Sequence, residues 1–248
     1  MHVVDTLSGT NVAEVAPDIF RISTPISSSQ MPGGFTFNQY LIVDDAPLLH
    51  HTGPRRMFLL VQKAVAHILG NAAKLRYVSF SHVEADECGA LNDWLRVAPE
   101  AQPVCGQIAA MVSMEDLADR PPLALPEGRE LTLGRKRVRW FDTPHLPHNW
   151  ECGHLFEAST QTLFCGDIFT RAGGAELPPL SEADPIGPAE AMRLAMPGSF
   201  ALEAGTRSGL EKLAATNPTT LALMHGSACR GEGAKVLREY ARVLERKP

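Results

Sequence analysis

The stretch Ser81-His82-Val83-Glu84-Ala85-Asp86-Glu87-Cys88-Gly89 places one imidazole and two carboxylates at alternate positions, directly after the largely apolar segment 75–80. In an extended or turning backbone, residues i, i+2 and i+4 point the same way, so we expect His82, Glu84 and Asp86 to converge. Such groups crowded beside a strand end are costly unless a cation compensates them. Taken alone, the stretch is equally compatible with a polar loop that faces water.

Three later residues favour the metal interpretation. His148 follows a strand candidate at 138–141, and Asp167 and His225 each follow a short apolar run that is typical of a buried strand. Four strand ends would then each carry a metal-binding type of side chain, which isolated caps or satisfied polar groups explain poorly. The candidate metal ligands are therefore His82, Glu84, Asp86, His148, Asp167 and His225.

This order of residues resembles the metallo-β-lactamase superfamily. In having a glutamate, Glu84, at the second ligand position, the chain resembles the flavodiiron proteins and the single-domain oxygen-binding di-iron proteins. The segment 37–45, which contains Asn38 and Leu41-Ile42 before an acidic turn, and the later Thr52-Gly53 agree with the same pattern. The resemblance covers roughly residues 10 to 245. It implies one domain over residues 1–248 with an α/β fold, an αββα sandwich of two mixed sheets carrying helices on their outer faces.

Glu87 departs from the wider superfamily, which has histidine at this position. The sequence leaves three roles open for Glu87: it binds the metal, it holds a water, or it opens the following helix. The Asp-Glu-Cys-Gly order is similar to the oxygen-binding di-iron subgroup. If Glu87 does not bind, the second metal keeps an open position, and we expect Phe35, Phe37 and Trp150 to line a pocket beside it.

The ligand types indicate which metal to expect. Zinc favours nitrogen and sulfur donors, whereas three histidines with three carboxylates suit iron or manganese better. We therefore expect two iron ions, with zinc or manganese as alternatives. Asp167 is the natural bridge, because its two oxygens can bind separate ions. The resemblance implies that His82, Glu84 and His148 hold one ion and that Asp86 and His225 hold the other. Three carboxylates and two ferrous ions together carry a small net positive charge. This charge is the same after each ion loses one electron and a doubly charged peroxide binds, so the charge balance favours holding reduced dioxygen.

Other histidines compete for roles at the site. His145 is an alternative to His148, but the spacing from His148 to the apolar segment 155–157 matches the family, so we expect His145 to hydrogen-bond nearby groups. His154 lies within a strand pattern and is predicted to be structural. His50 and His51 either approach the site or have a packing or turn role.

The bulk composition is that of an ordinary globular domain, with 44% hydrophobic and 21% charged residues. The formal net charge of −5 gives no reason to expect nucleic acid or an anionic membrane as a partner. The chain contains no apolar run long enough for a membrane span, and its first residues do not look like an export signal. Scattered cysteines in odd number favour a reducing cytoplasm over a disulfide framework; they are Cys88, Cys105, Cys152, Cys165 and Cys229.

Strand and helix patterns alternate along the chain. Strands are predicted at 12–23, 38–50, 75–80 and 221–224, and residues 130–141 and 153–166 are predicted to hold three strands joined by turns. Helices are predicted at 56–69, 90–97, 106–117, 189–196, 206–215 and 231–245. Segments 27–37 and 173–188 are rich in glycine, proline or serine and are predicted to be loops.

Two functions follow as hypotheses. The first is a non-haem di-iron protein that binds dioxygen, as a sensor or as a slow reductase with a separate electron donor. A signalling protein and a second copy of the chain are further candidate partners. The alternative is a metal-dependent hydrolase of an ester, thioester, lactone or lactam, in which a metal-bound hydroxide attacks the substrate. Glu84 and the missing histidine at position 87 favour the first hypothesis. The sequence does not decide whether dioxygen is only bound or is turned over.

Overall fold

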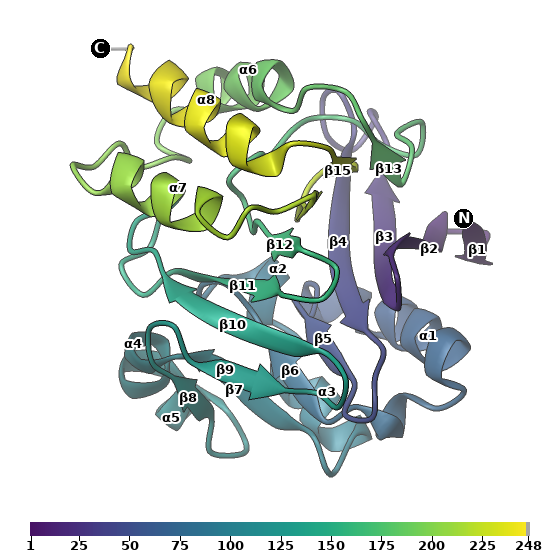
Figure 1. The fold of residues 1–248 in the computed structure, drawn as a ribbon. Helices are drawn as coiled ribbons and strands as arrows, with labels where there is room; N and C mark the ends of the chain where they lie inside the picture. The colour runs from purple at the N-terminus through teal and green to yellow at the C-terminus, as the bar shows by residue number, and fades with distance from the viewer. Residues whose placement is uncertain (247–248) are drawn as a thin grey trace.

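The computed structural model describes residues 1–246 and contains two β-sheets that pack face to face (Figure 1). The first sheet runs in the order β1 to β8: His2–Asp5, Thr10–Ala16, Ile19–Ile26, Phe35–Ile42, Leu48–His50, Tyr77–Ser79, Gln102–Gly106 and Leu123–Leu125. The second runs in the order β13-β15-β14-β12-β11-β10-β9. Its strands β9 to β15 are Glu130–Thr132, Arg137–Asp142, Gly153–Glu157, Thr162–Phe164, Leu180–Ser181, Thr220–Ala222 and Ala228–Arg230. Both sheets combine parallel and antiparallel pairs.

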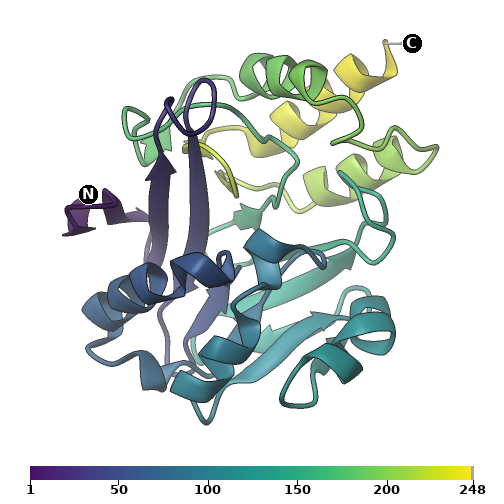
Figure 2. The same cartoon turned by 180° about the vertical axis from the view of Figure 1, so that it is seen from behind.

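Helices cover the two outer faces. On the first sheet lie α1 (Phe58–Leu69) and α3 (Leu91–Val97), which are in front of the strands when the molecule is seen from behind (Figure 2). On the second sheet lie α6 (Ile186–Ala195), α7 (Thr206–Ala214) and α8 (Gly233–Glu245). The predicted αββα sandwich of two mixed sheets is therefore confirmed.

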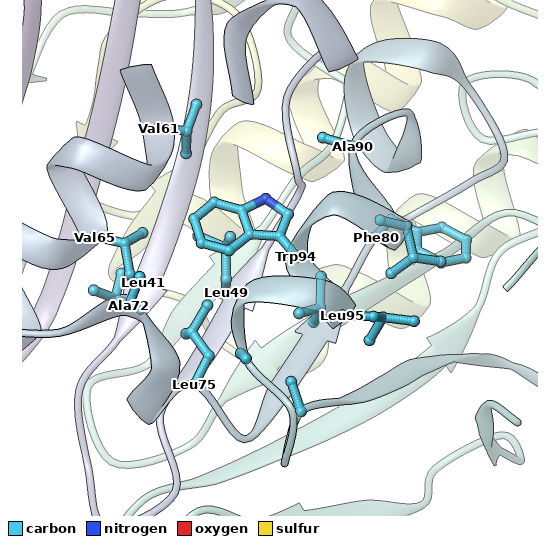
Figure 3. Packing of buried hydrophobic residues seen from close by; sticks show 14 of the residues in the cluster. Leu41, Leu49, Val61, Val65, Ala72, Leu75, Phe80, Ala90, Trp94 and Leu95 are labelled. Atoms are coloured by element: carbon cyan, nitrogen blue, oxygen red, sulfur yellow. The ribbon is translucent and has the colours of Figure 1, made fainter. Parts of the chain in front are cut away.

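The outer layer of the first sheet is held by an apolar cluster around Trp94 of α3. Figure 3 shows the Trp94 ring among side chains from α1, from the first sheet and from the segment before β6, including Val61, Leu49 and Leu75. The Trp94 indole also donates a hydrogen bond to the carbonyl of Thr52 at 3.3 Å. Burying such large side chains contributes about 1.5–3 kcal/mol each, so this cluster fixes the helices that follow the site loops.

A second cluster lies between the sheets. Tyr40 and Leu48 of the first sheet are in one buried cluster with Trp140, Leu155 and Phe164 of the second. Because these side chains alternate with residues that face the helices, the apolar runs of the central strands are nearly continuous. The shared core brings the ends of strands from both sheets to one edge of the molecule.

Several boundaries differ from those predicted. The predicted strand 12–23 is a hairpin, because Asp18 has φ +60 and turns the chain between β2 and β3. The segment 38–50 is likewise divided into β4 and β5, which pair antiparallel. The predicted helix 106–117 contains a π-helical stretch at Ala110–Met114, flanked by α4 (Gln107–Ala109) and α5 (Glu115–Leu117).

The loop 173–188 also contains more structure than predicted. It includes β13, and α6 begins at Ile186, so Gly187 and Pro188 lie in its first turn, where proline is tolerated. Short 3₁₀ turns at Arg55–Met57 and Ala72–Lys74 flank α1. Within residues 1–246, no helix is long and apolar enough to cross a bilayer, and all five cysteines are unpaired.

Candidate metal centre

The six predicted ligands meet at the edge where strands of both sheets end. His82 and Glu84 lie in the loop after β6, and Asp86 lies in the short helix α2 (Ala85–Cys88). His148 lies in the loop between β10 and β11, whereas Asp167 and His225 follow β12 and β14. Of the two backbone forms expected for the first cluster, extended or turning, the chain is extended at Glu84 and then turns into α2 from Ala85.

One group of donor atoms gathers around His82. Its Nε2 atom lies 2.8 Å from Oε2 of Glu84 and 2.8 Å from Nε2 of His148. The distance from His148 Nε2 to the same Glu84 oxygen is 3.2 Å. Asp167 Oδ2 completes the group at 3.9 Å from His82 and 3.7 Å from His148. The four side chains offer donor atoms that all lie within 4.8 Å of one another.

These distances fit a metal ion. Two donor atoms bonded to one ion at about 2.1 Å lie about 3 Å apart when the bonds meet at right angles. The separations of 2.8 and 3.2 Å around His82 have this size. Two imidazole nitrogens that face each other at 2.8 Å share at most one proton, whereas an ion between them would accept both lone pairs.

Asp167 also faces a second group through its other oxygen. Its Oδ1 atom lies 3.0 Å from Nε2 of His225, and that nitrogen lies 3.3 Å from Oδ2 of Asp86. The two oxygens of one carboxylate thus face different donor groups. This arrangement is compatible with two ions that share Asp167.

Backbone carbonyls fix two of the histidine tautomers. Nδ1 of His148 lies 2.8 Å from the carbonyl oxygen of Ser199, and Nδ1 of His225 lies 2.8 Å from that of Thr36. A carbonyl oxygen only accepts, so each Nδ1 carries a proton and each Nε2 faces the site, where a metal ion would take its lone pair. Such outer hydrogen bonds orient metal-binding histidines. Sequence analysis does not find them, because every residue type has a carbonyl group.

Glu87 does not face the donor atoms of either group. Its fully buried carboxylate accepts hydrogen bonds from the backbone amides of Ser81 at 2.8 Å and His82 at 2.7 Å, and from the Ser81 hydroxyl. It also lies 3.3 Å from His82 Nδ1 and 3.4 Å from His51 Nε2. Glu87 therefore holds the loop and one ring of the site. This role differs from direct metal binding. Glu87 does not open the helix either, because Glu84 is the N-cap residue of α2 and Glu87 lies within it.

The carboxylates and imidazoles shift each other's pKa values. Hydrogen bonds from His148 and His82 lower the pKa of Glu84 to about 2. Burial by itself disfavours the charged form of His225, but Asp167 and Asp86 raise its pKa to about 10. Burial likewise opposes ionisation of Asp167, yet His225, His82 and His148 hold its pKa well below the usual range. The site is therefore a negative cluster that attracts protons or other cations.

The loop that carries His225 is braced by the first sheet. The side-chain amide of Asn38 donates to the carbonyls of Leu223 at 2.9 Å and Gly226 at 2.8 Å. The Tyr40 hydroxyl donates to the same Leu223 carbonyl at 2.8 Å, and the Arg21 guanidinium donates to that of Gly226 at 3.0 Å. These buried contacts connect the two sheets at the residues that flank His225. The segment around Asn38 was recognisable in the sequence, but its contacts were not.

The remaining histidines lie outside the two donor groups. His145 is exposed to solvent, so the structure does not bear out a hydrogen-bonding role for it around the site. His154 is buried in β11 and bonds Thr143 at 2.7 Å and the Cys165 carbonyl at 3.2 Å, which confirms its structural role. His50 and His51 are buried at the end of β5, with ring centroids 4.1 Å apart.

A cavity of about 620 Å³ opens above the donor groups. Phe35 and Phe37 line it as expected, and the Phe35 ring stacks on His225 with centroids 4.2 Å apart. Trp150 was wrongly predicted to line this cavity: its side chain is 56% exposed and lies outside the lining. The opposite wall comes from α6 and the segment after it.

Solved structures share this fold at low sequence identity. The flavodiiron core of Flv1 from Synechocystis sp. PCC 6803 has a TM-score of 0.79 and 21% identity, covering 95% of this chain and 61% of that one. The rubredoxin oxygen:oxidoreductase of Desulfovibrio gigas has a TM-score of 0.78 and 22% identity, covering 96% and 62%. At these identities the likeness establishes the fold, which is that of the flavodiiron metallo-β-lactamase core.

Curated relatives match a smaller part of the chain. Diflavin flavoprotein A 2 of Synechocystis sp. is 29% identical over 140 residues, which is 55% of this chain and 24% of that protein. The chain thus spans about a quarter of the length of the curated relatives it matches. Residues 35–184, which include five of the six predicted ligands, match the protein family described as "ODP family beta lactamase". The matched region covers more than half of the chain, and the chain belongs to this family.

Proposed function

We propose that this protein is a non-haem di-iron protein that binds dioxygen. The observation that carries the proposal is the position of Asp167, whose Oδ1 faces His225 and whose Oδ2 faces the group around His82. A carboxylate placed in this way is suited to bridge two ions. The three histidines and three carboxylates form an oxygen-rich set that suits iron or manganese better than zinc.

The ligand assignment follows the two groups of donor atoms. His82, Glu84 and His148 would hold one ion, Asp86 and His225 the other, and Asp167 both. When bound, ferrous ions would supply electrons and open coordination positions for dioxygen. The chain's own residues keep the histidine lone pairs inward, through the Ser199 and Thr36 carbonyls, and surround the second group with aromatic rings.

The wider context of this function is also proposed. The name of the rubredoxin oxygen:oxidoreductase pairs a protein, rubredoxin, with oxygen. By analogy, we infer that this chain uses a separate electron-donor protein if it reduces dioxygen. A cytoplasmic location, a homodimer and one domain over residues 1–248 remain predictions. The core shared by both sheets supports a single domain, although residues 247–248 lie outside the described part.

Metal analysis and absorption spectroscopy test the proposal together. The chain is expressed in iron-replete medium, purified without oxygen, analysed for iron and zinc, and then mixed with air-saturated buffer. We expect up to two iron atoms per chain and a lasting change in the visible spectrum. Asp167→Asn should lose iron, whereas the matched control Asp184→Asn, at an exposed carboxylate, should retain it. Stoichiometric zinc with rapid cleavage of an ester or lactone would instead support the hydrolase alternative.

A further inference from the structure

The cavity above the donor groups is much larger than a diatomic gas requires. Its volume is about 620 Å³, whereas one water molecule takes up about 30 Å³ in the liquid. Pockets for small organic molecules commonly measure about 300–1,000 Å³. A cavity of this size is therefore suited to a molecule with a body of many atoms.

The cavity separates polar and apolar surfaces. Its base is formed by the proposed metal ligands, with Asp167 and His225 among them, and its walls are largely apolar. The apolar wall residues include Met31, Phe35, Phe37, Ile168, Met192 and Phe200. Methionine side chains adapt to ligands of different shape, and aromatic rings bury a large area at small entropic cost. These walls match a ligand with an apolar body.

The base of the cavity favours an anionic head group. Three carboxylates and two divalent ions carry a small net positive charge, so an oxygen anion that binds the ions would balance it. Arg193 in the wall is not a competing anion site, because its guanidinium donates to Glu190 at 2.9 and 3.2 Å. The anionic end of a ligand is therefore directed to the metal end of the cavity.

We propose that this cavity binds an apolar organic acid, whose oxygen head reaches the ions and whose body lies between β4 and α6. The inference rests on the proposed function only in requiring metal ions at the donor groups. It adds an organic ligand to the dioxygen chemistry considered above. Such a ligand would occupy the space through which dioxygen reaches the site.

Two hydroxamates of different length test this inference on the full chain loaded with zinc. Zinc is redox-inert, so the result does not depend on iron or dioxygen chemistry. Acetohydroxamate carries only the chelating head, whereas octanohydroxamate adds six methylenes. Each buried methylene contributes about a fourfold gain in affinity, so burial of only three gives octanohydroxamate an advantage of about 60-fold in calorimetry. Zinc content is measured before and after titration to exclude stripping.

Variants on one helix locate the binding site. Met192 lines the cavity, whereas Leu194 of the same helix is 60% exposed and lies outside the lining. Met192→Gln should weaken octanohydroxamate about tenfold and leave acetohydroxamate unchanged, because the variant places an amide against the alkyl chain. Leu194→Gln should change neither affinity.

Three outcomes would overturn the proposed ligand class. They are equal affinities of the two hydroxamates, no binding of either by protein of measured zinc content, and equal weakening by Leu194→Gln and Met192→Gln. Each of these outcomes can be distinguished from failure of the di-iron proposal. That failure is a lack of iron uptake or of a spectral response to air, and neither is measured in this experiment.

Discussion

The carboxylate of Glu87 accepts a hydrogen bond from the backbone amide of His82 at 2.7 Å and lies 3.3 Å from Nδ1 of the same residue. Glu87 thus holds the backbone of a proposed metal ligand and lies beside its ring, where the Ser81 hydroxyl is 3.2 Å from the same Nδ1 atom. With Nδ1 directed to Ser81 and Glu87, the Nε2 atom of His82 faces Glu84 and His148. A carboxylate behind a metal-binding histidine both orients the ring and increases its basicity.

Glu87→Gln should weaken metal binding at the His82 group by about tenfold to 100-fold, the usual effect of removing such an outer partner. The amide has one acceptor oxygen, and its NH₂ group would face the donors that Glu87 now accepts from Ser81 and His82. A competition titration with a chromophoric chelator measures the change.

Glu151→Gln is the matched control for this prediction. The Glu151 carboxylate accepts from the backbone amide of Val83 at 3.0 Å, in the same loop, and from the side-chain amide of Asn149 at 3.4 Å. Its replacement should change metal affinity by much less. Equal effects of the two variants would mean that Glu87 acts through loop stability alone.

The position of Asp167 between two donor groups gives a second prediction. Asp167→Ala should lower the occupancy of both ions, because its oxygens face both groups, whereas His225→Ala should mainly empty one. Metal content after dialysis against a fixed free-metal concentration measures the stoichiometry. Full loss in both variants would contradict the division of ligands proposed here.

Sequence analysis predicts the layers well because the chemistry of this chain is concentrated at strand ends. Buried strands with continuous apolar residues precede His82, Asp167 and His225, and each strand is followed by a polar residue that needs a partner. The hairpin turn at Asp18 is missed because apolar residues continue on both sides of Pro17-Asp18. The start of α6 is missed because Gly187-Pro188 is typical of loops, although the first turn of a helix accepts proline.

The contacts at the site could not be predicted from the sequence for a different reason. Ligand types are visible in the sequence, but the partners of Glu87 depend on how the loop after β6 turns back. The contacts of His148 and His225 are to carbonyl groups of Ser199 and Thr36, which carry no signature of residue type. Trp150 follows a predicted ligand closely, yet its exposed side chain shows that neighbours in sequence point in different directions in a turning loop.

Two buried histidines predict a loss of stability in acid. Burial lowers the pKa of His154 to about 3, and burial with the nearby charge of His154 lowers that of His50 to about 3, against 6.5 when unfolded. The unfolded chain therefore binds more protons between these values. Their stabilising contribution is complete above pH 6.5 and is lost as pH falls towards 3, with a slope of about 1.4 kcal/mol per pH unit for each group.

His154→Gln should reduce this slope by the contribution of one group. Denaturant unfolding of metal-free protein at several pH values between 4 and 7, measured beside the unsubstituted chain, reports the difference. An unchanged slope in His154→Gln would show that His154 is not held neutral in the fold.

The brace beneath His225 gives the last prediction. Asn38 is fully buried and donates to the carbonyls of Leu223 and Gly226 on either side of His225. Asn38→Ala leaves both carbonyls with fewer donors and removes packing, so the free energy of unfolding should fall by about 2–4 kcal/mol. Because Nε2 of His225 would then be positioned less firmly, binding of the second ion should weaken while the first is retained. Asn11→Ala is the control, since Asn11 donates only within its own hairpin, to Gly9 at 3.0 Å. If Asn38→Ala destabilises the fold but leaves both metal affinities unchanged, the brace supports the sheets and not the position of His225.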